Sequence, residues 1–252
     1  MEYKSYSIRW AVIFAAICLV IGTHVCWLAF SPIAYETSSY LSNTTNSNIT
    51  TQNVNLLASI SFPFGFCFGL VSIYIFDSYG VYYPLITGGW LTTIGCIIRL
   101  VVIYSNSPSY ITLMVAQIFN SIGSPLVNLC STKLASVWFP AEQTTLANTM
   151  VSTSIPLGVL MTYLISPAVV TEGAVASDFQ TLVWIYASPV FLGTVLMSFV
   201  LPFREPRGCP KTPPNGTADV PTKSFFQGIK SLFTNPMYLL TVGTCGSGVA
   251  YG

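Results

Sequence analysis

The stretch AQIFNSIGSPLVNLCSTKLASVWFPAE, residues 116–142, decides the fold class of this chain. It is apolar enough for a lipid bilayer, and it stops abruptly at Trp138-Phe139-Pro140. Its polar side chains include Gln117, Asn120, Asn128 and Lys133. Amides at bilayer depth are costly unless they face protein partners or a water-filled cavity. The stretch therefore predicts a membrane helix that forms one wall of an interior pathway.

The composition agrees with a membrane protein. Hydrophobic residues make up 52% of the 252 residues, charged residues only 7%, and the mean hydropathy is +0.66. A soluble domain carries roughly 25% charged residues. The formal net charge of +1 provides no basic stripe, so nucleic acid is excluded as a partner. We expect an integral membrane protein whose partners are the lipid bilayer and a small-molecule solute.

Apolar segments long enough to span a bilayer predict an all-α, polytopic fold, since a span needs about 20 residues. Six such segments lie at residues 11–34, 55–76, 83–104, 109–132, 145–170 and 180–202. We expect residues 1–203 to form a six-helix bundle and the Pro-rich residues 204–236 to form a cytoplasmic linker. A seventh apolar segment begins near Met237, so residues 237–252 are expected to begin a second bundle of a longer protein.

The basic residues predict the orientation. A cytosolic N-terminus places every Lys and Arg except Arg99 at the cytoplasmic side. The same orientation puts the sequons at Asn43 and Asn48 outside, where both are expected to be glycosylated. The sequon at Asn215 then lies in the cytosol and is expected to stay unmodified.

His24 and Trp27 lie three residues apart in the first apolar segment and therefore share a helix face. His24 is either a proton relay or solute ligand, or a neutral side chain bonded to a neighbouring helix. Trp27 is either an anchor at the membrane surface or a cavity wall that stacks on a cationic or planar solute. The residue pattern alone leaves both alternatives open.

Four residues are candidates for gating or structural roles. Asp77 and Gly80 belong to an Asp-Ser-Tyr-Gly turn, where a carboxylate can cap the next helix or hold a conformational latch. Glu142 follows the Trp-Phe-Pro stop and can serve the same purpose. Arg99, near the outer end of the third segment, either extends its charge to the surface or contacts a charge or solute inside.

Small residues and cysteines are expected to serve packing. Gly65 and Gly69 form a GxxxG pair that favours close helix contact. Of the seven cysteines only Cys209 lies in a polar segment, and no CxxC or Cys/His cluster is present. We therefore predict buried thiols and no metal site. The sequence also contains no catalytic or nucleotide-binding motif, so we expect neither an enzyme nor a bound cofactor.

The turn at Asp77–Gly80 resembles the Asp-x-x-Gly signature of the major facilitator superfamily, although Val81 and two tyrosines stand where basic residues usually follow. A closer resemblance is to solute carrier family 49, the relatives of the feline leukaemia virus subgroup C receptor. It is carried by residues 27–33, the Gln117, Asn120, Pro125 and Asn128 set, residues 135–139, Glu142, Leu157-Gly158, Pro167, Arg99 and residues 248–251. The Gln–Asn–Pro–Asn spacing looks most like the branch named disrupted in renal carcinoma 2.

This resemblance implies transport of a small organic solute between two six-helix bundles by alternating access, as a uniporter or with protons. Choline, ethanolamine, haem and a pyridoxine-like vitamin are the solutes of that family. The resemblance places Trp27 and Tyr251 in an aromatic cage, with Pro156 where choline-transporting members have a solute-contacting Gln. His24, Gln117, Asn120 and Asn128 would supply polar contacts to the solute. The membrane would be the plasma membrane or the lysosomal membrane.

Two alternatives of a different class stay open. A seven-helix receptor fits the number of apolar segments, but it requires an extracellular N-terminus. A non-transporting membrane binding protein fits the polar cavity without transport.

Overall fold

The computed structural model describes residues 9–45, 48–105, 108–171, 173–200 and 234–240. The chain divides into two compact units, Met1–Lys211 and Thr212–Gly252. In the described part of the second unit, a short helical segment contains a bond from the Leu239 N–H to the Asn235 carbonyl oxygen. The first unit is built from helices, and its described residues contain no strand, which confirms the predicted all-α class.

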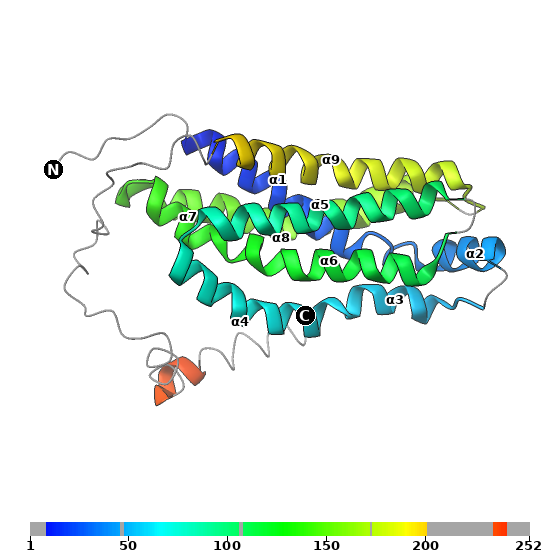
Figure 1. Cartoon of the computed structure of the whole chain (residues 1–252), viewed down its shortest axis with the longest axis horizontal. Coiled ribbons are helices and arrows are strands. Elements are labelled where there is room, and N and C mark those ends of the chain that lie inside the picture. Colours follow the sequence, from blue (N-terminus) through cyan, green and yellow to red (C-terminus); the bar gives the residue numbers. More distant parts are fainter. Residues whose placement is uncertain (1–8, 46–47, 106–107, 172, 201–233, 241–252) are drawn as a thin grey trace. The chain divides into compact units, whose positions relative to one another are not determined.

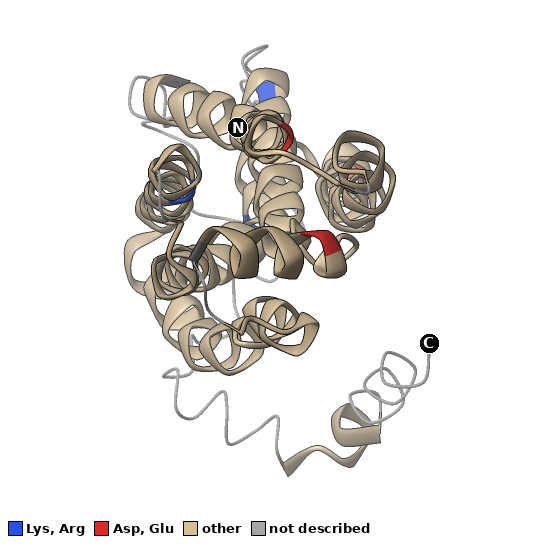
Figure 2. Cartoon of the chain, turned by 90° about the vertical axis from the view of Figure 1, so that its right-hand side faces the viewer, with Lys and Arg blue, Asp and Glu red and all other residues tan. Residues whose placement is uncertain are grey.

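The helices of the first unit run side by side (Figure 1). They are α1 (Arg9–Leu28), α2 (Ala34–Thr45), α3 (Thr51–Ser59), α4 (Ser61–Tyr79), α5 (Tyr82–Tyr104), α6 (Tyr110–Asn128), α7 (Cys130–Trp138), α8 (Ala141–Val169) and α9 (Ala176–Val200). Charged residues are sparse along them (Figure 2).

Six helical stretches are long and apolar enough to cross a membrane, which confirms the predicted number in the first unit. Helices α1, α5, α8 and α9 each form one span, while α3–α4 and α6–α7 each form one span from two helices. The predicted stop at Trp138-Phe139-Pro140 is also confirmed, because α7 ends at Trp138 and α8 begins at Ala141.

The first span ends earlier than predicted. Helix α1 stops at Leu28 rather than continuing to residue 34, and α2 begins at Ala34. Pro32 lies between them, and a proline disfavours helical backbone at the residue before it, here Ser31, so a continuous helix is disfavoured. Helix α2 was not predicted, and Figure 1 shows it at the end of the bundle opposite to α7.

Two spans are interrupted near prolines. The α3–α4 span breaks at Ile60, three residues before Pro63, and the α6–α7 span breaks at Leu129, four residues after Pro125. A proline supplies no backbone N–H, so it weakens the helical hydrogen-bond ladder around it.

Glycines allow α5 and α6 to approach closely. A Cβ on Gly123 would lie 2.7 Å from the Gly88 carbonyl oxygen, and one on Gly88 would lie 2.9 Å from the Gly123 carbonyl oxygen. Real side-chain atoms cannot occupy these positions, so both glycines are required for this contact. Such small residues are the usual solution where membrane helices pack backbone to backbone.

Burial differs strongly between helices. In the apolar window of α1, 61% of residues are buried inside the bundle, compared with 11% in the α3–α4 window. Helix α1 is therefore central, and α4 lies at the edge of the described bundle. Phe62 and Phe66 on α4 are 64% and 72% exposed.

The thiols largely follow the prediction of buried cysteines. Cys26, Cys96 and Cys130 are buried, whereas Cys67 on α4 is exposed. The sulfur atoms of Cys26 and Cys96 lie 3.5 Å apart and join α1 to α5.

Candidate functional site

An open cavity of about 330 Å³ lies against residues of α1, α4 and α6, together with Leu129 after α6. It is lined by His24, Trp27, Ser61, Phe62, Gly65, Gly69, Asn120, Ser121, Ser124, Pro125, Asn128 and Leu129. These lining residues carry no Lys, Arg, Asp or Glu side chain. The wall is thus polar and aromatic without a fixed charge.

The structure brings four predicted solute-binding residues to this one cavity. His24 and Trp27 come from α1, and Asn120 and Asn128 come from α6. Gln117 lies outside the lining, and Tyr251 lies outside the described residues. The pairing of Trp27 with Tyr251 in an aromatic cage therefore stays a prediction.

The polar wall of α6 follows the helical repeat. Asn120, Ser124 and Asn128 are spaced four residues apart, so they occupy one face. The Asn120 Nδ2–H donates to the Thr23 carbonyl oxygen at 3.4 Å, and the Asn128 Nδ2–H donates to the Ser124 Oγ at 3.0 Å. These two bonds tether the amide nitrogens to the protein.

The amide oxygens of Asn120 and Asn128 are different. Both Oδ1 atoms are shielded, and neither has a hydrogen-bond partner. Asn120 is only 2% exposed, on a face that borders the cavity. Buried polar atoms are almost always hydrogen-bonded, so unpartnered oxygens on two residues that line one cavity are unusual.

His24 is buried, and its Nδ1 lies 2.8 Å from the Val20 carbonyl oxygen. A carbonyl only accepts, so Nδ1 carries the proton in this contact. In the neutral ring Nε2 is then a hydrogen-bond acceptor. His24 thus contributes an acceptor nitrogen to a residue set that lines the cavity. This bond lies within α1 itself, and both alternatives that the sequence left open for His24 stay predictions.

Trp27 is held by both its N–H and its ring. The Nε1–H donates to the Ala58 carbonyl oxygen at 3.1 Å, two residues before the break at Ile60. The ring packs edge-on against Phe62 with centroids 5.8 Å apart, and against His24 at 6.2 Å. Trp27 and Phe62 together provide the aromatic part of the lining.

Gln117 sits behind the wall and is 2% exposed. Its Oε1 accepts a bond from Arg99 Nη2, while its Nε2–H group donates to the Trp27 carbonyl oxygen at 3.2 Å and to the Ser61 Oγ at 3.0 Å. The hydrogen bonds of Gln117 thus all go to other residues of the protein. This arrangement suits a residue that holds Trp27 and Ser61 in position.

Arg99 is buried rather than extended to the surface, with 3% of its area exposed. Besides Gln117, its Nη1 donates to the Cys26 carbonyl oxygen at 2.7 Å, and its guanidinium lies 5.7 Å from the centre of the Phe30 ring. Arg99 thereby ties α5 to α1 and α6 close to the cavity.

The other three gating candidates lie at helix ends outside the cavity lining. Gly80 ends α4 with φ +75° and ψ −161°, a conformation that only glycine adopts readily. Glu142 is exposed in the first turn of α8. Asp77 lies in the last turns of α4, and its side chain is outside the described set. Their gating roles stay predictions.

Gly65 and Gly69 do not pack as expected in the described bundle. A Cβ on either residue would meet no atom within 4 Å, and both line the cavity instead. The GxxxG pattern on α4 thus marks an open face there.

Several lining residues were not predicted. Ser121 lies one helical turn after Gln117, and Ser124 lies one turn after Asn120, so extending the polar face in steps of four would have found both. Ser61 and Phe62 join the site because of the break at Ile60. The nearby Pro63 was the available signal, although it does not indicate which residues face inward.

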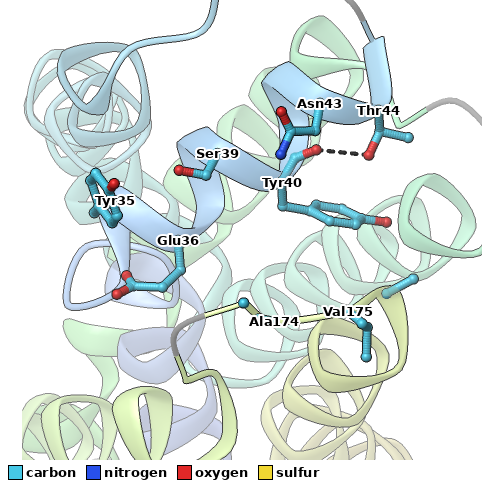
Figure 3. A pocket seen from close by; sticks show the side chains of 10 residues that line it. Tyr35, Glu36, Ser39, Tyr40, Asn43, Thr44, Ala174 and Val175 are labelled. Carbon is cyan, nitrogen blue, oxygen red and sulfur yellow. Dashed lines mark hydrogen bonds between the residues drawn. The ribbon is translucent and has the colours of Figure 1, made fainter.

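A larger cavity, of about 690 Å³, lies between α2 and residues 173–176 (Figure 3). Its lining includes Tyr35, Glu36, Tyr40 and the predicted glycosylation site Asn43. The Tyr40 ring stacks on Phe179 at 4.6 Å, and partial burial raises the pKa of its phenol. This cavity contains none of the predicted solute-binding residues, so the smaller one is the candidate site.

The fold and the site define an integral membrane protein with six spans in its described helices and an uncharged polar cavity among them. The family model of the Major Facilitator Superfamily matches residues 12–252. The chain therefore belongs to the major facilitator superfamily.

Its curated relatives confirm the resemblance to solute carrier family 49. The chain is 31% identical to solute carrier family 49 member A3 of Xenopus tropicalis, over 98% of this chain and 50% of the relative. It is 27% identical to the protein of the same name from Danio rerio, over 98% and 50% respectively. An uncharacterized protein of Caenorhabditis elegans is 25% identical over 99% of this chain and 47% of its own length. The chain thus spans about half the length of the curated relatives it matches.

Proposed function

We propose that the chain forms one side of a pathway that carries a small organic solute across a membrane by alternating access. The observation that carries this proposal is the cavity between α1, α4 and α6, whose lining is polar and aromatic and carries no charged side chain. Substrate sites near the middle of the membrane, between bundles that rock against each other, are typical of secondary transporters.

The lining favours some solutes of the family over others. Trp27 and Phe62 offer aromatic surfaces, which suit a cationic or planar molecule. The cavity is at the lower end of the roughly 300–1,000 Å³ that is usual for ligand sites. No lining residue offers a cation for the carboxylates of haem. Choline, ethanolamine or a pyridoxine-like vitamin therefore fits this wall better than haem.

His24 is our candidate for proton coupling. It lines the cavity, and its Nδ1 is engaged by a backbone carbonyl, which leaves Nε2 to exchange a proton. If His24 couples protons, His24→Gln abolishes solute-driven acidification without abolishing solute exchange. A uniporter shows no solute-driven acidification in either protein.

Uptake by cells expressing the full protein tests the proposal, with labelled choline, ethanolamine and pyridoxine as probes. We expect Trp27→Ala to reduce uptake at least tenfold, because it removes the aromatic wall and the bond to Ala58. Trp90→Ala is the matched control, since Trp90 is 47% exposed on α5 and does not line the cavity.

Equal uptake by wild type, Trp27→Ala and Gln117→Ala would contradict this site assignment. Binding of a probe to the purified protein without any uptake would instead support a non-transporting binding protein.

A further inference from the structure

We propose that Arg99 is a positioning residue of the cavity: together with Gln117 it holds the last turn of α1, and it thereby fixes the Trp27 ring where a solute stacks on it. This inference rests on the transport function proposed above, and it names a residue outside the cavity lining on which that site depends. Arg99 acts through Trp27 and does not itself contact the solute.

The first support is the end of α1. The last four carbonyl groups of a helix have no partner within it, so they need donors from elsewhere. Helix α1 ends at Leu28, which places Cys26 and Trp27 in its last turn. The Arg99 Nη1–H group donates to the Cys26 carbonyl oxygen at 2.7 Å, and the Gln117 Nε2–H group donates to the Trp27 carbonyl oxygen at 3.2 Å. Side chains from α5 and α6 therefore hold two consecutive carbonyls of α1.

The second support is the bond between these two donors. The Arg99 Nη2–H group donates to the Gln117 Oε1, which leaves the Gln117 amide nitrogen for the Trp27 carbonyl. An amide has a donor end and an acceptor end, so the bond from Arg99 decides which end meets α1. Loss of Arg99 removes this constraint on the Gln117 amide. The substitution therefore affects both carbonyls of α1, although Arg99 binds only one of them.

The third support is the charge of Arg99. Its side chain is 3% exposed, and its guanidinium lies against the Cys26 carbonyl, the Gln117 amide and the Phe30 ring. A charge buried at this depth persists where neighbouring groups compensate it. The C-terminal end of a helix carries a partial negative charge, which favours a cation beside it. The end of α1 thus accounts for the place of Arg99 in the bundle.

These contacts converge on Trp27. The carbonyl of Trp27 binds Gln117, the carbonyl before it binds Arg99, and the ring Nε1–H donates to the Ala58 carbonyl oxygen at 3.1 Å. The ring then packs edge-on against Phe62, and the two form the aromatic part of the lining. A shift of the last turn of α1 moves this ring. Arg99 therefore controls the affinity for a solute that stacks on Trp27.

The test is a double-mutant cycle in the full protein. It uses the KM for whichever of choline, ethanolamine and pyridoxine the wild type takes up. We expect Arg99→Met to raise this KM about tenfold. Arg99→Lys keeps the charge but not the planar fork that reaches two acceptors, and it is expected to raise the KM at least threefold. In a protein that already carries Trp27→Leu, both substitutions are expected to change the KM of the remaining uptake less than twofold, because the ring is gone.

Fluorescence provides a second readout that requires no uptake. Subtracting the emission of a Trp27→Phe protein from that of its parent isolates the contribution of Trp27. We expect acrylamide to quench this contribution about twofold more strongly in Arg99→Lys than in the wild type, because the end of α1 is held less firmly.

Thr93→Val is the matched control. Thr93 lies on α5 like Arg99, is 4% exposed, and donates through its Oγ1 to the Thr194 Oγ1 at 3.1 Å. The substitution removes a buried bond between helices without touching the end of α1. It is expected to leave both the KM and the quenching of Trp27 unchanged. Thermal unfolding of every variant verifies folding, and Arg99→Lys decides alone if Arg99→Met does not fold.

The outcomes separate this inference from the proposed function. A wild type that takes up none of the three probes removes the proposed function and this inference with it. Uptake by the wild type, with an equal rise in KM whether or not Trp27 is present, shows a general structural role for Arg99 and overturns the inference alone. Unchanged quenching of Trp27 in Arg99→Lys also overturns it and leaves the function standing.

Discussion

At the scale of single residues, Arg99 is the most demanding feature of the bundle. It is a charged side chain with 3% exposure, and it contacts the Cys26 carbonyl, the Gln117 amide and the face of Phe30. Charges at bilayer depth are expensive, and they persist where hydrogen bonds compensate them. A substitution that removes the Gln117 amide therefore breaks the hydrogen bonds to Arg99, Trp27 and Ser61 at the same time.

We predict that Gln117→Leu lowers the stability of the protein by about 1.5–3 kcal/mol, the usual value of a hydrogen bond to a charged group. Gln117→Glu keeps an oxygen acceptor for Arg99 and is expected to unfold at a higher temperature than Gln117→Leu. Thermal unfolding of the two purified variants in the same detergent measures the difference. Identical unfolding temperatures would show that the Arg99 contact contributes little.

At the scale of helices, the sequence correctly predicted the features that depend on the length of apolar segments and on the position of proline. The six apolar stretches and the stop at Trp138-Phe139-Pro140 follow from composition alone. It did not predict α2, whose residues carry no long apolar stripe, nor the break at Ile60. It marked Gln117 as polar but could not show that Arg99, on another helix, occupies its oxygen. Contacts between helices depend on packing that spacing along the chain does not encode.

Two glycine substitutions test the helix packing. A Cβ on Gly123 would lie 2.7 Å from the Gly88 carbonyl oxygen and from the Thr92 Oγ1, so Gly123→Ala is expected to cost about 1–3 kcal/mol of stability. A Cβ on Gly65 meets nothing within 4 Å, so Gly65→Ala is expected to be neutral or stabilising by about 0.4–1 kcal/mol. Thermal unfolding compares them, and equal losses would contradict the close α5–α6 contact.

At the scale of the whole molecule, the predicted orientation is consistent with how the ends of the spans meet. The Arg9 guanidinium lies 5.3 Å from the centre of the Phe139 ring, so the start of α1 and the α7–α8 turn are at the same end. Both were predicted to be cytoplasmic. The sequon at Asn43 lies in the last turn of α2 and the one at Asn48 follows this helix, and Figure 1 places α2 at the opposite end of the bundle from α7.

Glycan mapping tests this orientation. We predict that enzymatic deglycosylation shifts the mobility of the wild type and not that of the Asn43→Gln, Asn48→Gln double variant. Asn48 is exposed outside any helix, which makes it the more accessible acceptor, whereas Asn43 lies within α2. Asn215→Gln is expected to leave the shift unchanged. A glycan on Asn215 would reverse the predicted topology.

The contact between the thiols of Cys26 and Cys96 can report the distance between α1 and α5. Their sulfur atoms lie 3.5 Å apart, and a disulfide requires about 2.05 Å, so a small approach of α1 to α5 suffices for cross-linking. The rate at which a mild oxidant joins them reports how closely α1 and α5 approach each other within this bundle. Relative motion at the centre of the bundle can therefore be followed in the native sequence, without introducing a single new cysteine.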